Sequence, residues 1–331
     1  MASSIEPPSL SYLSQDWPNV EQWKSIARAK VHELMSFQPP ETSLDASTDS
    51  VREHEGLVIE RISYNMPYGP RTEGFFMYPE ERSGRLPAVI ALHDHGGFKY
   101  YGKEKTCWTG AEPEILKTFK KESYGGRSWA TELAKKGFAV LSVDLFLWGS
   151  RKVPVESLGD FYRNRFVGLK DGSEDFILEY NQFTSEHEHT MAKTLLAAGS
   201  TLQGVFTYED RRSVDYLLTR PEIDPNRIGC GGLSGGGLRT IFLFGLDPRI
   251  KCGVCVGFMS TFRELLRFHI KCHTWMLYLP HLLKFLDLPD LIALGAPNPL
   301  MVQCDTEDEL FTLNGQKMAD RKISEIYAKL A

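Results

Sequence analysis

The segment that decides the fold is Cys230-Gly-Gly-Leu-Ser-Gly-Gly-Gly237, which contains the pattern G-x-S-x-G centred on Ser234. Before it, the apolar run Ile228-Gly-Cys230 predicts a short strand. After it, Leu238-Arg-Thr-Ile-Phe-Leu-Phe244 predicts a helix that begins at once. A strand, a sharp turn and a helix form the setting in which a serine hydroxyl is exposed at the end of a sheet. We therefore predict that Ser234 is a catalytic nucleophile; the alternative is a Gly-rich turn with a helix-capping serine.

A second Gly-rich loop follows an earlier apolar run, in Ala88-Val-Ile-Ala-Leu-His-Asp-His-Gly-Gly97. A loop at the end of a buried strand, opposite the nucleophile, supplies one of two backbone N-H donors for a developing oxyanion, and the residue after the nucleophile supplies the other. We predict that these donors are the N-H groups of His95 and Gly235. The side chains of His93 and His95 are expected only to hydrogen-bond carbonyls of the loop.

The segment Asn298-Pro-Leu-Met-Val-Gln-Cys-Asp-Thr-Glu-Asp-Glu-Leu-Phe311 reads as a strand followed by an acidic turn. A carboxylate just past a strand end can orient and stabilise a catalytic imidazole. Four acidic residues compete for this role. We predict Asp308, because it lies far along the turn and precedes the apolar pair Leu310-Phe311, with Asp305 in reserve. The alternative is a solvated acidic loop.

The apolar runs elsewhere in the chain predict the architecture around these segments. Short continuous runs alternate with helical stretches, which is typical of a parallel sheet buried on both faces within a three-layer α/β/α sandwich. The predicted strands are 88–92, 138–143, 228–230, 252–258 and 300–303. The predicted crossover helices are 128–136, 207–219, 238–245 and 315–330.

Residues outside this alternation predict the remaining organisation. An amphipathic helix over 19–36 opens the chain, and alternating residues in 57–65 and 72–78 predict an antiparallel strand pair at the sheet edge. We expect a helical extension at 1–55 and one domain at 56–331, interrupted by insertions at about 149–188 and 260–290. The second insertion is rich in apolar residues and is expected to form a lid over Ser234, with core packing as the alternative.

Composition excludes several classes of function. The 331 residues are 42% hydrophobic and 24% charged, with a net charge of -5 and no basic run, which argues against a nucleic-acid or anionic-membrane surface. The first residues form no targeting signal and no long apolar run occurs, so we predict a cytoplasmic protein whose partner is a small-molecule substrate. Six scattered cysteines predict reduced, buried thiols, and neither a metal site nor a cofactor motif is expected. The pair Cys252-Gly-Val-Cys255 lacks a partner pair.

Taken together, the serine segment, the H-x-H-G-G loop and the stretch Asp144-Leu-Phe-Leu-Trp-Gly-Ser-Arg151 resemble the α/β-hydrolase superfamily. Within it, the chain is similar to the dienelactone-hydrolase and acetyl-xylan-esterase-like group, which is related to prolyl oligopeptidase. The resemblance implies a serine esterase acting on a small ester. The alternatives are a catalytically silent fold that binds a ligand, or a peptidase.

One feature departs from this resemblance. In the superfamily a histidine follows the acid on a loop after the last strand, whereas residues 312–331 contain no histidine. We therefore expect the final strand and helix to be missing, with an open gap between Ser234 and Asp308, an exposed apolar edge where that strand and helix would pack, and very low activity. Other histidines remain open as candidates for the base: His93, His95, His187, His189, His269, His273 and His281.

Overall fold

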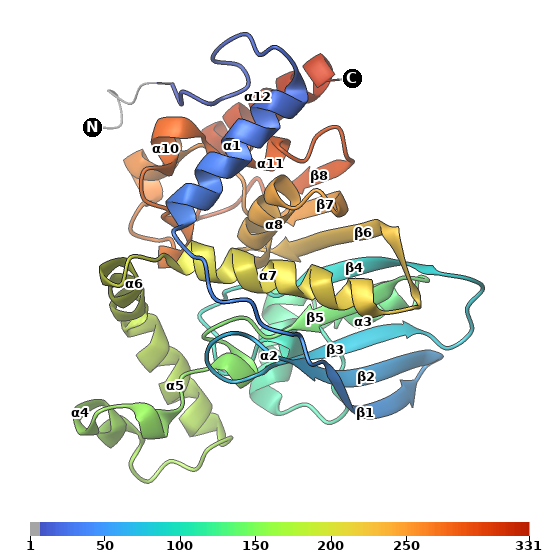
Figure 1. The fold of residues 1–331 in the computed structure, drawn as a ribbon. Coiled ribbons are helices and arrows are strands. Elements are labelled where there is room, and N and C mark those ends of the chain that lie inside the picture. Colours follow the sequence, from blue (N-terminus) through green and yellow to red (C-terminus); the bar gives the residue numbers. More distant parts are fainter. Residues whose placement is uncertain (1–6, 331) are drawn as a thin grey trace.

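The structure is a computed structural model that describes residues 7–330. Part of the segment searched for a targeting signal therefore lies outside the described residues. Eight strands form one sheet in the order β1-β2-β3-β5-β4-β6-β7-β8 (Figure 1). Strands β4 to β8 run parallel to one another, while β1, β2 and β3 join them through antiparallel pairs. The predicted α/β architecture with a mostly parallel sheet is confirmed.

The strands of the sheet lie close to the predicted runs. Their bounds are β1 Ser47–His54, β2 Leu57–Tyr64, β3 Thr72–Pro79, β4 Leu86–Leu92, β5 Ala139–Val143, β6 Ile223–Leu233, β7 Ile250–Val256 and β8 Leu300–Gln303. The predicted antiparallel pair is β2 and β3, but the prediction that it forms the sheet edge is wrong, because β1 lies outside it. Strand β1 is exposed along almost its whole length, so it has no apolar alternation by which sequence could reveal it.

Helices cover the sheet unequally. The long helices are α1 Val20–Met35, α2 Glu114–Tyr124, α5 Glu174–Glu186, α6 Glu188–Ala197, α7 Leu202–Thr219, α8 Gly235–Leu246 and α12 Leu313–Leu330. The short ones are α3 Trp129–Ala134, α4 Asp160–Arg163, α9 Phe262–Glu264, α10 Leu282–Phe285 and α11 Leu288–Ala293. The four predicted crossover helices correspond to α3, α7, α8 and α12, whereas α2 lies in a segment without a prediction.

One face of the sheet carries the main core. Helix α8 is buried at every residue, and α1 and α7 join the same core through fully buried side chains such as Trp23, Val31 and Val214. On the opposite face a smaller core forms between α3 and the strands β2 to β5, around Met77, Ala130 and Val140. The prediction of burial on both faces holds for residues 228–232 of β6 but fails for β7, where Cys252 is exposed and Val254 and Val256 are half-buried.

The two insertions differ in form. Residues 149–188 were predicted as the first, and the structure continues it through α6 to Ala197; α4 and α5 extend away from the sheet in Figure 1. The second consists of α9, a π-helical turn at Leu265–His269, a 3-10 turn at Trp275–Leu277 and α10. Within residues 7–330, no helix combines the length and the apolar character that crossing a bilayer requires.

Candidate active site

Ser234 lies between β6 and α8, in the strand, turn and helix setting that the sequence predicts. Its backbone has φ 55° and ψ -118°, a conformation that is costly for a residue with a side chain and that persists only where surrounding contacts enforce it. Its N-H donates to Val256 O at 2.9 Å, and its carbonyl accepts from Leu238 N at 3.0 Å. The serine is partly exposed at the carboxyl end of the sheet.

Glycines around Ser234 allow the backbone of the neighbouring strand to approach. A Cβ at Gly232 would lie 2.3 Å from Leu92 O, and a Cβ at Gly236 only 2.1 Å from the same oxygen. Real Cβ atoms essentially never come so close. The G-x-S-x-G pattern thus has a steric cause, since the end of β4 packs directly against the turn.

The two predicted oxyanion donors meet at this turn. A Cβ at Gly235 would lie 2.6 Å from the backbone nitrogen of His95, so the loop after β4 packs against the first residue of α8. Gly235 opens the helix, where N-H groups have no partner within the helix. Among the hydrogen bonds of residues 7–330, none uses the N-H of His95. Two backbone donors are therefore available beside Ser234.

Buried basic side chains bind the loop after β4, residues 93–97, which is called the oxyanion loop below. Arg239, on α8, donates to His93 O at 3.2 Å and to both oxygens of Asp210 on α7, at 3.1 and 2.6 Å. Lys105 donates to Asp94 O at 2.6 Å. Sequence alone gave no sign of these contacts, because each joins residues of different elements.

The side chains of the two loop histidines have different partners. His93 Nδ1 lies 2.9 Å from Asp94 O, as expected for a histidine that bonds the loop's own carbonyls. The same expectation is wrong for His95, whose Nε2 lies 2.5 Å from Glu188 Oε2 in α6. Burial lowers the pKa of both histidines, although the Glu188 carboxylate opposes that shift at His95.

The stretch from Asp144 to Arg151 supports the same loop. Asp144 is buried and accepts from Lys103 Nζ at 2.7 Å and from Ser150 N at 2.8 Å. Burial opposes the ionisation of Asp144, but the charge and hydrogen bond of Lys103 outweigh it and lower the pKa of the carboxyl. Arg151 pairs with Glu209 at 2.6 Å in the interior. These ion pairs are structural contacts behind the loop.

The predicted acidic residues lie on the rim that carries Ser234. Val256, whose carbonyl binds Ser234 N, pairs in the sheet with Leu233 on one side and Gln303 on the other, and the acidic turn follows directly. Asp308 is half-buried and accepts from Leu310 N at 2.7 Å. Asp305 is exposed and accepts from Glu307 N at 3.0 Å. Both carboxylates therefore cap their own turn.

His273 is the candidate histidine that lies at the acidic turn. Its Nε2 lies 3.1 Å from Leu310 O, and its ring packs against Phe311 and Phe258 at centroid distances of 4.7 and 5.8 Å. Burial lowers the pKa of His273, while the charge of Asp308 acts in the opposite direction. The imidazole is held by a main-chain carbonyl rather than by either predicted acid.

The second insertion reaches the rim of the site but also contributes to the core. Four of its apolar side chains, Phe262, Leu265, Met276 and Leu277, are buried in the main core, whereas Phe268 and Trp275 remain 52% and 39% exposed. Thr274 and Trp275 bind Glu188 and so bring the segment beside the oxyanion loop. Core packing thus accounts for four apolar residues of the predicted lid.

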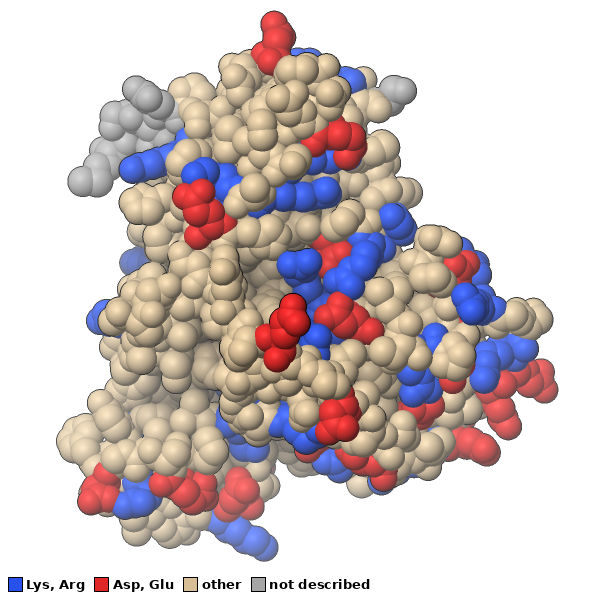
Figure 2. Space-filling model, in the orientation of Figure 1, with Lys and Arg blue, Asp and Glu red and all other residues tan. Residues whose placement is uncertain are grey.

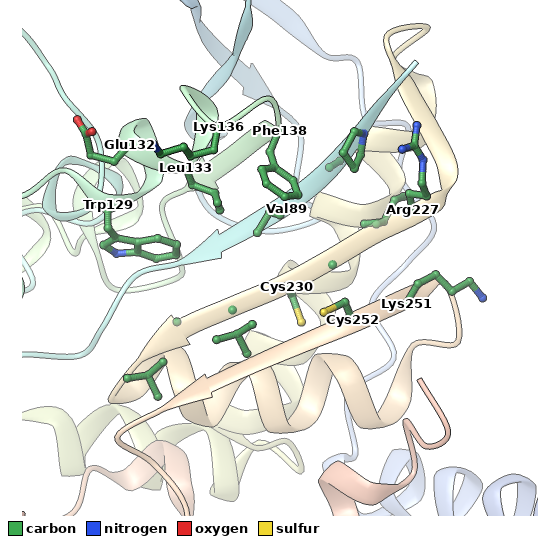
Figure 3. A pocket seen from close by; sticks show the side chains of 18 of the residues that line it. Val89, Trp129, Glu132, Leu133, Lys136, Phe138, Arg227, Cys230, Lys251 and Cys252 are labelled. Carbon is green, nitrogen blue, oxygen red and sulfur yellow. The ribbon is translucent and has the colours of Figure 1, made fainter. Parts of the chain in front are cut away.

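An apolar trough of about 850 Å³ runs over β6 between α3 and β7 (Figure 3). Trp129, Leu133 and Phe138 form one wall, and the glycines of β6 leave the floor hollow. The lining follows β6 as far as Leu233, the residue before Ser234. At the other end Arg227 and Lys251 contribute basic side chains (Figure 3). Parallel strands are ordinarily covered on both faces, whereas this trough leaves apolar surface uncovered on one face of the sheet, away from the edge strand β8.

Surface charge and thiols complete the description. On the face shown in Figure 2, basic and acidic residues are interspersed rather than gathered into one basic patch. All six cysteines are free, but the expectation of buried thiols holds for Cys107, Cys230 and Cys255 only; Cys252, Cys272 and Cys304 are exposed. Among residues 7–330, no cluster of three or more His, Cys, Asp or Glu side chains is placed to hold a metal ion.

Comparison with known proteins extends the assignment of the fold. No family model matches the chain. The chain is 25% identical to "Putative hydrolase YtaP" of Bacillus subtilis over 304 residues, which is 91% of this chain and 87% of that protein. Among solved structures, a putative acetyl xylan esterase from Bacteroides fragilis superposes with a TM-score of 0.75 at 19% identity, covering 100% of this chain and 77% of its own. A glucuronoyl esterase from Solibacter usitatus gives a TM-score of 0.63 at 13% identity, covering 99% and 87%. The chain therefore has the α/β-hydrolase fold that its sequence resembles.

Proposed function

We propose that this protein is a serine hydrolase that cleaves a small carboxylic ester through an acyl-enzyme on Ser234. The observation that carries the proposal is the position of Ser234 at positive φ, beside the backbone nitrogens of Gly235 and His95. The hydrolase and esterase names of the compared proteins support the same chemistry.

In the proposed reaction Ser234 Oγ attacks the ester carbonyl carbon, and its proton passes to solvent water as the C-O bond to Oγ forms. The carbonyl oxygen becomes an oxyanion, which the N-H groups of Gly235 and His95 stabilise. The tetrahedral intermediate then collapses and expels the alcohol, which takes up a proton from solvent. Water hydrolyses the resulting acyl-enzyme. Asp308, with Asp305 in reserve, is the proposed acid that would orient an imidazole.

Turnover should be slow, because a serine hydroxyl without a positioned base is a poor nucleophile at neutral pH. An oxyanion hole alone retains part of the catalysis, so we expect a rate far below the ~10 per second of a median enzyme. A silent fold that binds a ligand is the second candidate. It is favoured by His273, whose Nε2 faces a main-chain carbonyl instead of a carboxylate.

The test is hydrolysis of p-nitrophenyl acetate by the protein and by Ser234→Ala. We expect weak release of nitrophenol that disappears in the variant. Ser83→Ala is the matched control, since Ser83 is exposed in the turn between β3 and β4, at the opposite end of the parallel strands. Equal rates in the protein and in Ser234→Ala would favour the silent fold. The small ester substrate and the cytoplasmic location remain predictions.

A further inference from the structure

The carboxylate of Glu188 joins three segments that are distant in the sequence. Its Oε2 lies 2.5 Å from His95 Nε2 and 2.6 Å from Lys99 Nζ, both in the loop after β4. Its Oε1 accepts from Thr274 Oγ1 at 2.5 Å and from Trp275 N at 2.8 Å, both in the second insertion. Glu188 itself opens α6 in the first insertion, so one carboxylate connects the oxyanion loop with both insertions.

This carboxylate is buried and ionised. Its side chain is only 8% exposed, and Lys99 is 2% exposed. Burial opposes the ionisation of Glu188, but the hydrogen bonds from His95 and Lys99 and the charge of Lys99 outweigh it and hold the pKa of the carboxyl far below its usual range. A buried carboxylate with four donors is satisfied, whereas removing its charge would leave the Lys99 ammonium without its counter-ion.

The same contacts fix the orientation of the His95 ring. Gly97 N donates to His95 Nδ1 at 3.1 Å, so Nδ1 is the acceptor and Nε2 carries the proton that faces Glu188. Both ring nitrogens are therefore engaged. Trp148 packs edge-on against the ring at a centroid distance of 5.2 Å and directs its Nε1 to His95 O at 3.4 Å.

A ring held at both nitrogens restrains the backbone to which it is attached. The nitrogen of that backbone is the atom that a Cβ at Gly235 would approach to 2.6 Å. We propose that Glu188 is a positioning residue of the oxyanion hole, which sets the His95 N-H beside Ser234 and makes that geometry depend on both insertions. This inference rests on the proposed function of Ser234.

The variant that tests it is Glu188→Gln, which keeps the shape of the side chain and one carbonyl oxygen but removes the charge. Glu186→Gln is the matched control, because Glu186 ends α5 two residues earlier and pairs only at the surface, with Arg165 and Gln182. We expect the acylation of Ser234 by p-nitrophenyl acetate to fall about 10- to 100-fold in Glu188→Gln, less than the 10²- to 10³-fold typical of deleting a donor. The ester concentration at half-maximal rate should change little.

A second substrate separates positioning from general damage. O-(p-nitrophenyl) thionoacetate replaces the carbonyl oxygen with sulfur, a weak hydrogen-bond acceptor, so its acylation depends less on the oxyanion donors. In Glu188→Gln the oxygen ester should lose more rate than the thionoester. Equal losses for the two esters, or no loss for either, would overturn the positioning role.

Hydrogen exchange provides a readout that does not require activity. Amides in 93–101 and 270–280 should exchange faster in Glu188→Gln than in the protein, and Glu186→Gln should leave both segments unchanged. Unchanged exchange in Glu188→Gln would overturn the proposal that Glu188 holds the loop after β4 and the second insertion in place. If acylation does not depend on Ser234 but the exchange result holds, the proposed function fails, while the connection that Glu188 makes between the loop and the insertions stands.

Discussion

Two sides of the candidate site differ in how many contacts hold them: the nucleophile side around Ser234, and the acid side at Asp305 and Asp308. Around Ser234, the backbone packs so closely at Gly232, Gly235 and Gly236 that a Cβ would lie less than 3 Å from its neighbours, and the Arg239 pair with Asp210 and the Glu188 contact add support. At the other side of the rim, Asp305 and Asp308 bind only their own turn, beside a half-buried His273. We infer that electrostatic stabilisation of an oxyanion and activation of a nucleophile are separable in this fold. Backbone nitrogens lie beside Ser234 for the first, whereas in the hydrogen bonds of residues 7–330 neither Asp305 nor Asp308 holds an imidazole for the second.

The largest effect is expected on the free energy of unfolding when the buried ion pair on the nucleophile side is removed. Arg239→Met would leave the Asp210 carboxylate buried without its partner, which typically costs about 3–5 kcal/mol of unfolding free energy. Chemical denaturation of the variant measures this loss. Arg263→Met, at an exposed position of α9, should change the free energy of unfolding by less than about 0.5 kcal/mol. Similar stabilities for the two variants would show that the pair does not support the loop.

Gly235→Ala should have the largest effect on chemistry at the nucleophile side. The new Cβ would press on the nitrogen and Cβ of His95, at 2.6 and 2.9 Å, and so displace one oxyanion donor. We expect acylation by p-nitrophenyl acetate to fall about 10²- to 10³-fold. Gly159→Ala is the control, because a Cβ there meets nothing within 4 Å and its φ is -63°. An unchanged rate in Gly235→Ala would place the oxyanion donors elsewhere.

Asp308→Asn, on the acid side, should change the rate of ester hydrolysis only slightly. In an assembled triad, the same change of an acid to its amide lowers kcat about 10⁴-fold. Here the carboxylate accepts from Leu310 N, a bond that the Asn side-chain oxygen can keep, so we expect less than about a threefold change. Steady-state rates for Asp308→Asn and Asp305→Asn give the answer. A large loss in either variant would mean that an acid already works with an imidazole in this chain.

His273→Ala should change the rate least. Its Nε2 lies 3.1 Å from Leu310 O, and among the hydrogen bonds of residues 7–330 none joins its ring to Ser234, so we expect the ring to support the turn. We expect a rate within about twofold of the parent, since a general base contributes 10²- to 10⁴-fold. His281→Ala, at an exposed position, serves as the control. A selective loss in His273→Ala would identify it as the base and refute the separation of the two sides.

The features that could be predicted from the sequence are those encoded within short segments of the chain. The turn at Ser234, the parallel strands and the donors at Gly235 and His95 follow from glycine placement and apolar runs within short segments. The contact of Glu188 with His95 spans 93 residues and leaves no periodic signal. Strand β1 has no apolar face, and the burial of Met276 and Leu277 depends on which elements lie beneath them. Those features are set by tertiary packing, which a local pattern does not encode.

The most direct test of the account is the site of covalent labelling by a fluorophosphonate, read by intact mass and by peptide mapping. We predict one adduct, on Ser234, formed slowly because no base activates the hydroxyl, and absent from Ser234→Ala. An unlabelled Ser234 in the folded protein, or an adduct that persists in Ser234→Ala, would contradict the claim that this serine is the nucleophile.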